Sequence, residues 1–122
     1  MLRAGLPEFL TVLEIAVLSL LLEDDSSENR ILRTQLASCS LESRERNGYG
    51  FFTNFKVDDA APRCGRSDFE LGDAAAVISD QRCGFILFVR EGTISFLEGY
   101  PLGGDEWPSP ENIEKVTRFR SC

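Results

Sequence analysis

Hydrophobic positions in the first part of the chain follow helical spacing. From Pro7 to Leu22, apolar residues recur at i, i+3 and i+4, and Pro7 followed by Glu8 is a helix-start signal. The pattern predicts a helix from Pro7 to about Leu22. The opposite face of this helix is also apolar, so we expect a second helix or a neighbouring subunit to cover it. The candidate residues for an oligomer interface are Ile15, Leu18 and Leu22.

A second, shorter helix is predicted directly after the first. Residues 25–28 (Asp-Ser-Ser-Glu) resemble a capping box, in which an N-cap side chain and a Glu three residues later satisfy backbone N–H groups. This helix would continue through Gln35. After about Ala37 the period changes from helical to alternating, which is typical of β-strands.

Two registers, set by the length of the turn, are possible for the first predicted hairpin. Its second strand, residues 49–57, alternates apolar and polar side chains. A two-residue turn would place charged residues such as Arg44 opposite the apolar face of that strand. A three-residue turn with a bulge at Gly48 removes this conflict and gives Gly50 no special role, so the bulged hairpin is the predicted arrangement.

The middle of the chain predicts a surface loop and then a strand that contains a bulge or a bend. Residues 58–68 contain Pro, Gly and charges without an apolar period, which predicts a surface loop. A third strand follows over residues 69–77. The adjacent Gly72 and Asp73 predict a bulge or a bend within it.

The most apolar stretch of the chain is a candidate central hairpin. Phe85 to Val89 is continuously apolar, which in an antiparallel sheet predicts a central strand covered on both faces, and residues 93–100 form its return strand. Ser109-Pro110 predicts one helical turn. Alternation from Lys115 to Arg120 then predicts a terminal edge strand, which its arginines protect against aggregation.

Together these elements predict a single α+β domain over residues 1–122. An N-terminal helix pair would pack on an antiparallel, meander-like sheet of about five strands. The apolarity of both faces of the first helix and of the central strand favours a homodimer.

Composition excludes several classes of chemistry. The chain has 122 residues, no histidine and a net charge of −7, so it lacks every His-based catalytic pair and metal site, and neither nucleic acid nor a membrane is an expected partner. The four cysteines form no C-x-x-C motif and no secretory signal precedes them, so we expect free thiols, a cytoplasmic location and no metal or cofactor. Cys64 lies between Arg63 and Gly65-Arg66 and is a candidate reactive thiol.

Carboxylates and aromatic rings gather after the central hairpin. Glu98 follows an apolar run, and if it points inward it must be protonated or paired with an arginine such as Arg44 or Arg118. The alternative is a solvated Glu at a strand end. Trp107 is either part of a binding pocket or a plug on the end of the sheet. No catalytic residue is assigned; the candidates for binding a ligand or partner are Glu98, Tyr100, Asp105, Glu106 and Trp107.

Two stretches carry a family resemblance. They are R-x-x-x-G-x-G-F-F-T-x-F, beginning at Arg44, and G-F-I-L-F-V-x-x-G-x-I-x-x-L-E-G-Y, beginning at Gly84 and followed by Trp107-Pro108. Together they resemble a group of small uncharacterised bacterial proteins, of the kind carried in mobile gene cassettes or near toxin-immunity loci. The resemblance implies a bacterial cytosolic α+β domain and transfers no catalytic residue.

Three functions are compatible with these features. The first is a non-enzymatic protein-protein interaction module, immunity-like or regulatory, that uses an acidic surface to bind a basic protein. The second is a small-ligand-binding protein with a pocket around Glu98, Tyr100 and Trp107. The third is a carboxylate-dependent hydrolase.

Overall fold

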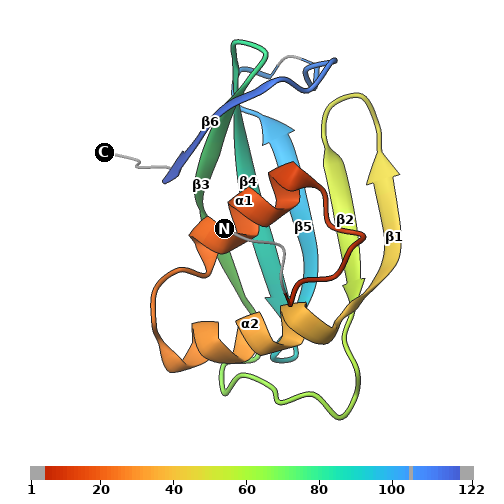
Figure 1. The fold of residues 1–122 in the computed structure, drawn as a ribbon, viewed down its shortest axis with the longest axis vertical. Coiled ribbons are helices and arrows are strands. Elements are labelled where there is room, and N and C mark those ends of the chain that lie inside the picture. Colours follow the sequence, from red (N-terminus) through yellow and green to blue (C-terminus); the bar gives the residue numbers. More distant parts are fainter. Residues whose placement is uncertain (1–4, 105, 119–122) are drawn as a thin grey trace.

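The computed structural model describes residues 5–104 and 106–118, and in it two helices pack on an antiparallel sheet of six strands (Figure 1). The α+β class predicted from the sequence is confirmed, with six strands in place of about five. In chain order the elements are α1 (Val12–Leu21), α2 (Ser27–Ser38), β1 (Ser40–Arg46), β2 (Phe51–Lys56), β3 (Phe69–Ile78), β4 (Gln81–Arg90), β5 (Thr93–Pro101) and β6 (Ile113–Arg118).

The strand order is β1-β2-β5-β4-β3-β6, with every neighbouring pair antiparallel. Strands β3, β4 and β5 form a meander, and the β1–β2 hairpin joins it beside β5. The connection from β2 to β3 therefore has to pass from one side of the meander to the other, and residues 57–68 make this connection without helix or strand. The central position predicted for Phe85–Val89 in β4 and the edge position predicted for β6 are both confirmed. The cover predicted for both faces of β4 is wrong, because both helices lie on one side of the sheet and Ile86 and Phe88 are only half-buried on the other.

Helix α1 begins at Val12, later than predicted from Pro7, because a capping box defines its start. The Thr11 hydroxyl accepts from the Glu14 backbone N–H at 3.1 Å, and the Glu14 side chain accepts from the Thr11 N–H at 2.9 Å. The N-cap of α2 is Ser26, one residue after the predicted position. Each cap satisfies backbone donors that the helix itself leaves unpaired.

Gln35 connects α2 to the loops at one end of the sheet. Its side chain is fully buried and donates to the carbonyl oxygens of Pro62 and Gly92 at 2.8 and 2.9 Å, and accepts from the Ile94 N–H at 2.9 Å. A buried amide with three satisfied hydrogen bonds fixes the positions of the groups that it joins. Gln35 thus links the 57–68 loop and the β4–β5 turn to the helix layer.

The register predicted for the first hairpin is wrong. Arg46 pairs with Phe51 and Arg44 with Thr53 across a longer turn, and the irregularity lies between Leu41 and Ser43. Both arginines consequently share the face of the apolar residues in β2. This arrangement is stable because each guanidinium has a partner there: Arg44 pairs with Glu14, and Arg46 lies 5.5 Å from the centre of the Phe51 ring.

Glycine is required at position 50, contrary to the sequence interpretation. A Cβ there would lie 2.1 Å from the carbonyl oxygen of Gly99, closer than any side chain can approach. Elsewhere the bulge predicted near Gly72 is confirmed, since the β3–β4 register shifts between Leu71 and Ala74. The helical turn predicted at Ser109-Pro110 is wrong, because that segment forms bends before β6.

The two faces of the sheet differ in coverage. Both helices lie on the same side of the sheet, as Figure 1 shows, and the other face carries no helix. On the helix side the strand residues are fully or almost fully buried. They include Phe51, Thr53, Ala74, Phe85, Leu87 and Leu97.

Candidate functional site

The uncovered side of the sheet carries a cluster of large side chains that we call the aromatic face. The register places these residues on one face: Phe96 pairs with Phe88, and Glu98 pairs with both Ile86 and Phe52. All are half-buried. The aromatic face consists of Phe52, Ile86, Phe88, Phe96, Glu98 and Tyr100.

The rings of the aromatic face pack on one another. Phe88 and Phe96 are stacked with their centroids 4.3 Å apart, and Phe52 meets Phe96 at 5.9 Å. The Arg90 guanidinium lies 5.2 Å from the centre of the Phe88 ring and pairs with Glu70 at 3.6 Å. The three phenylalanine rings therefore form a continuous aromatic surface, with the Arg90–Glu70 pair at its border.

Glu98 lies within this surface, between Phe52 and Ile86 of the neighbouring strands. Burial raises the pKa of its carboxyl above the ordinary value. The arginines expected to pair with it do not: Arg44 binds Glu14, and Arg118 binds Glu23, Asp24 and Asp73. Within residues 5–104 and 106–118, no hydrogen bond or ion pair joins Glu98 to another side chain.

Tyr100 lies beside Glu98 on the same face. Its ring covers Gly84, because a Cβ at that position would lie 2.6 Å from the ring. The pKa of the Tyr100 phenol is raised, first by burial and second by the negative charge of Glu98. The absence of a side chain at Gly84 in the central strand therefore leaves room for the Tyr100 ring over the backbone.

Trp107 lies on the opposite face from Glu98 and Tyr100. Its ring meets Phe51 and Phe85 edge-on, at 5.3 and 6.1 Å, and its Nε1–H donates to Glu111 at 2.6 Å. It is a plug on the helix side of the sheet, which was one of the two alternatives. Glu106 is exposed, and Asp105 lies outside the described residues.

Of the four binding candidates that the structure describes, only Glu98 and Tyr100 lie together on one face. Sequence reasoning missed their neighbours Phe52, Phe88 and Phe96. Alternation of side chains within each strand indicated which residues share a face of that strand. Only the register between β2, β5 and β4 shows that the three rings are neighbours.

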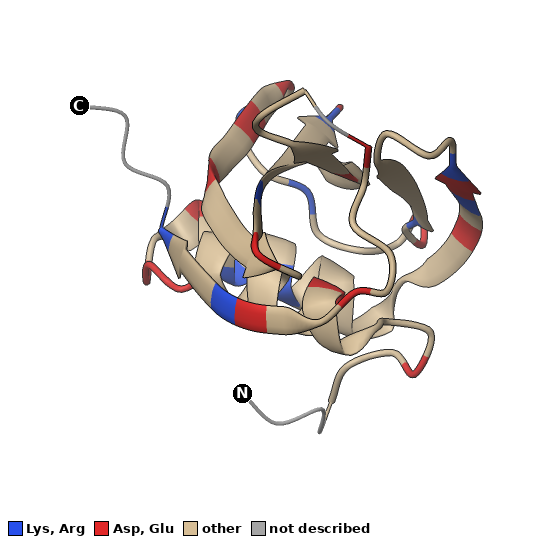
Figure 2. Ribbon diagram, turned by 90° about the horizontal axis from the view of Figure 1, so that it is seen from above, with Lys and Arg blue, Asp and Glu red and all other residues tan. Residues whose placement is uncertain are grey.

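Charge is spread over the molecule. In Figure 2, acidic and basic positions are interspersed over strands, helices and loops. Among the described residues no group of three or more acidic or cysteine side chains could hold a metal ion. The aromatic face is therefore distinguished by its rings and its single unpaired carboxylate.

A second carboxylate, Glu14, is buried on the helix side. One of its oxygens accepts from the Thr11 N–H and from Arg44 at 2.8 Å, and the other accepts from Arg44 Nε at 3.3 Å and from the Thr53 hydroxyl. Glu14 is only 2% exposed. The cluster fastens α1 to β1 and β2 and offers no open position to a substrate.

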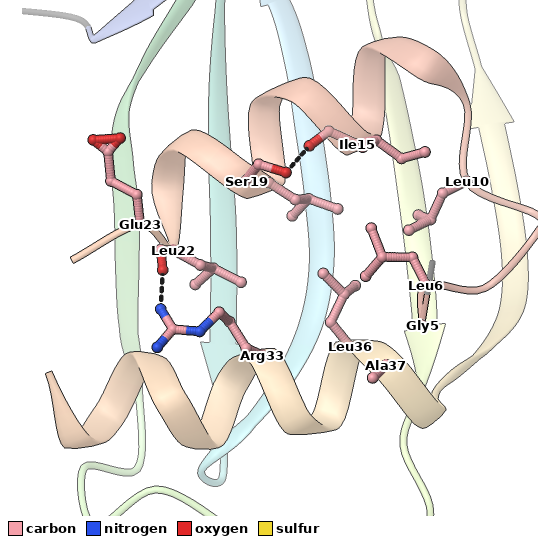
Figure 3. Close-up of a pocket in the computed structure, with 11 residues that line it drawn as sticks. Gly5, Leu6, Leu10, Ile15, Ser19, Leu22, Glu23, Arg33, Leu36 and Ala37 are labelled. Atoms are coloured by element: carbon pink, nitrogen blue, oxygen red, sulfur yellow. Dashed lines mark hydrogen bonds between the residues drawn. The ribbon is translucent and has the colours of Figure 1, made fainter. Parts of the chain in front are cut away.

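A pocket of about 510 Å³ lies between α1 and α2 (Figure 3). Ile15, Leu18 and Leu22, the proposed oligomer interface, line it and are 8%, 1% and 1% exposed. The second apolar face of α1 is therefore covered within the chain, by α2 and residues 5–10. These three residues lie inside the molecule and form no open surface for another subunit.

The cysteines within the described chain are free thiols: Cys39, Cys64 and Cys83. Burial raises the pKa of Cys39 and of Cys83 to about 11. Cys64 is also buried, and burial and the negative charge of Glu28 raise the pKa of its thiol. Its neighbours Arg63 and Arg66 therefore do not activate it as a nucleophile.

Comparison of the chain with protein-family models, with curated proteins and with solved structures found no match. No helix in the described part of the chain is long and apolar enough to cross a membrane.

Proposed function

We propose that this protein is a non-enzymatic interaction module whose aromatic face binds a basic segment of a partner protein. The observation that carries the proposal is the half-buried Glu98 carboxylate, which has no partner among the described residues and lies in an uncovered aromatic surface. A surface that combines rings with one unpaired charge is typical of a recognition site.

A basic side chain fits this site for two physical reasons. An arginine or lysine bound at Glu98 would form a charge-assisted hydrogen bond with a carboxylate that has already lost part of its hydration. The same cation would lie against Phe52 or Phe96, whose ring faces attract positive charge. The net charge of −7 would add long-range attraction for a basic partner.

A second copy of the chain is a less suitable partner for this face. Two copies related by a two-fold axis through the aromatic face would bring their Glu98 carboxylates toward each other. Like charges at an apolar interface are unfavourable. The homodimer expected from the sequence therefore becomes the competing outcome of the test.

The test uses synthetic peptides of alternating arginine and valine, with glutamate-valine peptides as the charge-reversed control. Binding is measured by fluorescence anisotropy. We expect the arginine peptides to bind, and Glu98→Gln to weaken that binding about tenfold, the usual effect of losing one charged hydrogen bond. The matched variant Asp59→Asn removes a charge from the exposed 57–68 loop and should bind like the wild type.

Three results would contradict the proposal. These are no binding of the arginine peptides, equal binding of the glutamate peptides, or full binding by Glu98→Gln. Light scattering on the protein alone addresses the competing partner. A dimeric mass that becomes monomeric in Phe88→Asp would assign the aromatic face to a second copy of the chain.

A further inference from the structure

Helices α1 and α2 lie side by side on the sheet, and their backbones are farther apart than those of closely packed helices. No Cα atom of one lies within 8 Å of a Cα atom of the other in the described chain, and the 510 Å³ pocket occupies the space between them. Packed helices normally approach to about 8–10 Å between axes, and protein interiors leave few voids larger than a water molecule. A pocket of this size between two helices lies within the usual range of ligand sites, about 300–1,000 Å³.

The walls of the pocket are aliphatic. They come from α1, α2 and residues 5–10, and none of the lining side chains carries an aromatic ring. Such walls suit a flexible hydrocarbon chain better than a planar heteroaromatic ring, which is commonly held by stacking. The main apolar residues of the wall are Leu6, Leu10, Ile15, Leu18, Leu22 and Leu36.

The charged side chains lie at one end of the pocket, and the Ser19 hydroxyl, which donates to the Ile15 carbonyl at 2.6 Å, lies midway along α1. In Figure 3, Arg33 and Glu23 are at the end near Leu22, and Leu6 and Leu10 are at the other end. The Glu23 carboxylate turns away from Arg33 and pairs with Arg118 at 3.1 Å. The pocket is thus polarised, with a guanidinium at one end and mainly hydrocarbon, interrupted by Ser19, along the remainder.

Arg33 retains donors for a ligand. Its Nη1 donates to the backbone carbonyls of Leu22 and Asp24, and its Nη2 donates to Asp25 at 3.3 Å. The Nε–H makes no bond to another described residue, and Nε with Nη2 is an edge of the guanidinium that can bind a carboxylate through two hydrogen bonds. Asp25 competes for this edge, but its side chain is 77% exposed, so water screens the pair.

We infer that this pocket binds a single-chain carboxylic acid amphiphile, a fatty acid, with its carboxylate on Arg33 and its chain along the leucine walls toward Leu6 and Leu10. The site is on the helix side of the sheet, opposite the aromatic face. The inference therefore goes beyond the proposed interaction function and does not depend on it.

The experiment uses the full chain and cis-parinaric acid, a fatty acid that fluoresces in apolar surroundings. We expect its fluorescence to rise on titration and palmitic acid to displace it. Arg33→Gln should weaken binding of the acid about tenfold or more, because it removes a charge-assisted pair. The same variant should leave binding of the matched alcohol, hexadecanol, unchanged.

Matched variants separate occupancy of the pocket from loss of the fold. Arg30→Gln removes an exposed arginine of α2 that pairs with Asp25 but does not line the pocket, and it should bind like the wild type. Ala37→Phe adds a ring at an exposed position on the pocket rim and should block binding; Thr34→Phe adds the same ring to α2 outside the pocket and should not. Circular dichroism confirms that each variant is folded.

Three results would overturn the inference. The first is the absence of saturable fluorescence with the wild-type protein below the concentration at which the acid forms micelles. The second is binding that persists undiminished in both Arg33→Gln and Ala37→Phe. Binding of acid and alcohol with equal affinity to wild type and to Arg33→Gln would likewise exclude Arg33 as the carboxylate ligand.

Discussion

Glu14 and Glu98 approach opposite faces of the same sheet and have opposite environments. Glu14 is 2% exposed under α1, and both of its oxygens accept hydrogen bonds from Thr11, Arg44 and Thr53. Glu98 is only half-buried, yet it has no such partner in the described chain, and burial raises the pKa of its carboxyl. The more deeply buried of the two carboxylates is the one whose hydrogen bonds are satisfied.

This difference separates a carboxylate that joins elements of the fold from one that lies on an uncovered face. A buried charge with all its hydrogen bonds made holds elements together, and removing one partner leaves the other unpaired. A half-buried charge without partners has lost part of its hydration with no hydrogen bond to replace it, which lowers stability. The same distinction applies to the aromatic rings, since those on the helix side are core and those on the other side are uncovered.

The largest expected effect compares two phenylalanines of β4. Phe85 is fully buried against Phe51 and Trp107, whereas Phe88 is half-buried on the aromatic face. We expect Phe85→Ala to lower the free energy of unfolding by about 4 kcal/mol and Phe88→Ala by about 1 kcal/mol, measured by urea denaturation. Equal losses would show that both faces of the sheet are covered in solution.

The next effect tests the Glu14 cluster. Glu14→Ala should lower the free energy of unfolding by about 3 kcal/mol, because it leaves Arg44 and Thr53 without their acceptor. This value is at the lower end of the range for buried pairs, since the Arg44 side chain is 23% exposed. The double variant Glu14→Leu with Arg44→Leu should be more stable than Glu14→Ala. Additive losses in the double variant would refute the coupling of the two residues.

The smallest effect concerns Glu98 and has the opposite sign. Because burial raises the pKa of folded Glu98 above that of the unfolded chain, the stability linked to this group is greatest below the unfolded pKa and falls as pH rises through the folded pKa. Glu98→Gln removes this loss. Its stability relative to wild type should therefore increase from about pH 4 to about pH 7. Thermal unfolding at both pH values measures this difference, and a constant difference would place Glu98 in solvent.

Local patterns predicted the elements of the fold well. The helix pair, the central strand Phe85–Val89, the bulge near Gly72 and the edge strand β6 follow from periodicity and turn chemistry, which depend on neighbours along the chain. The start of α1 was predicted five residues too early. The Thr11–Glu14 capping box was present in the sequence. The helix start was assigned to Pro7 instead, because proline is common in the first turn of a helix.

Some features that depend on contacts between distant segments were predicted wrongly or left open between alternatives. The register of β1 and β2 was wrong because the apparent conflict of charges is resolved by Glu14, a residue of α1 that no local pattern connects with Arg44. The place of Trp107 depended on which face of the sheet the segment after β5 crosses. The coverage of Ile15, Leu18 and Leu22 depended on where α2 packs.

The sequence by itself determined the class of fold, the types of its elements and the absence of imidazole chemistry, because these follow from local spacing and composition. Only the tertiary structure decided which of the twenty acidic residues are buried and which of these have hydrogen-bond partners. It buried Glu14 among donors and left Glu98 among the rings of the uncovered face. The environment of a charge is set by the side chains that surround it in space, and these come from strands and helices distant in the chain.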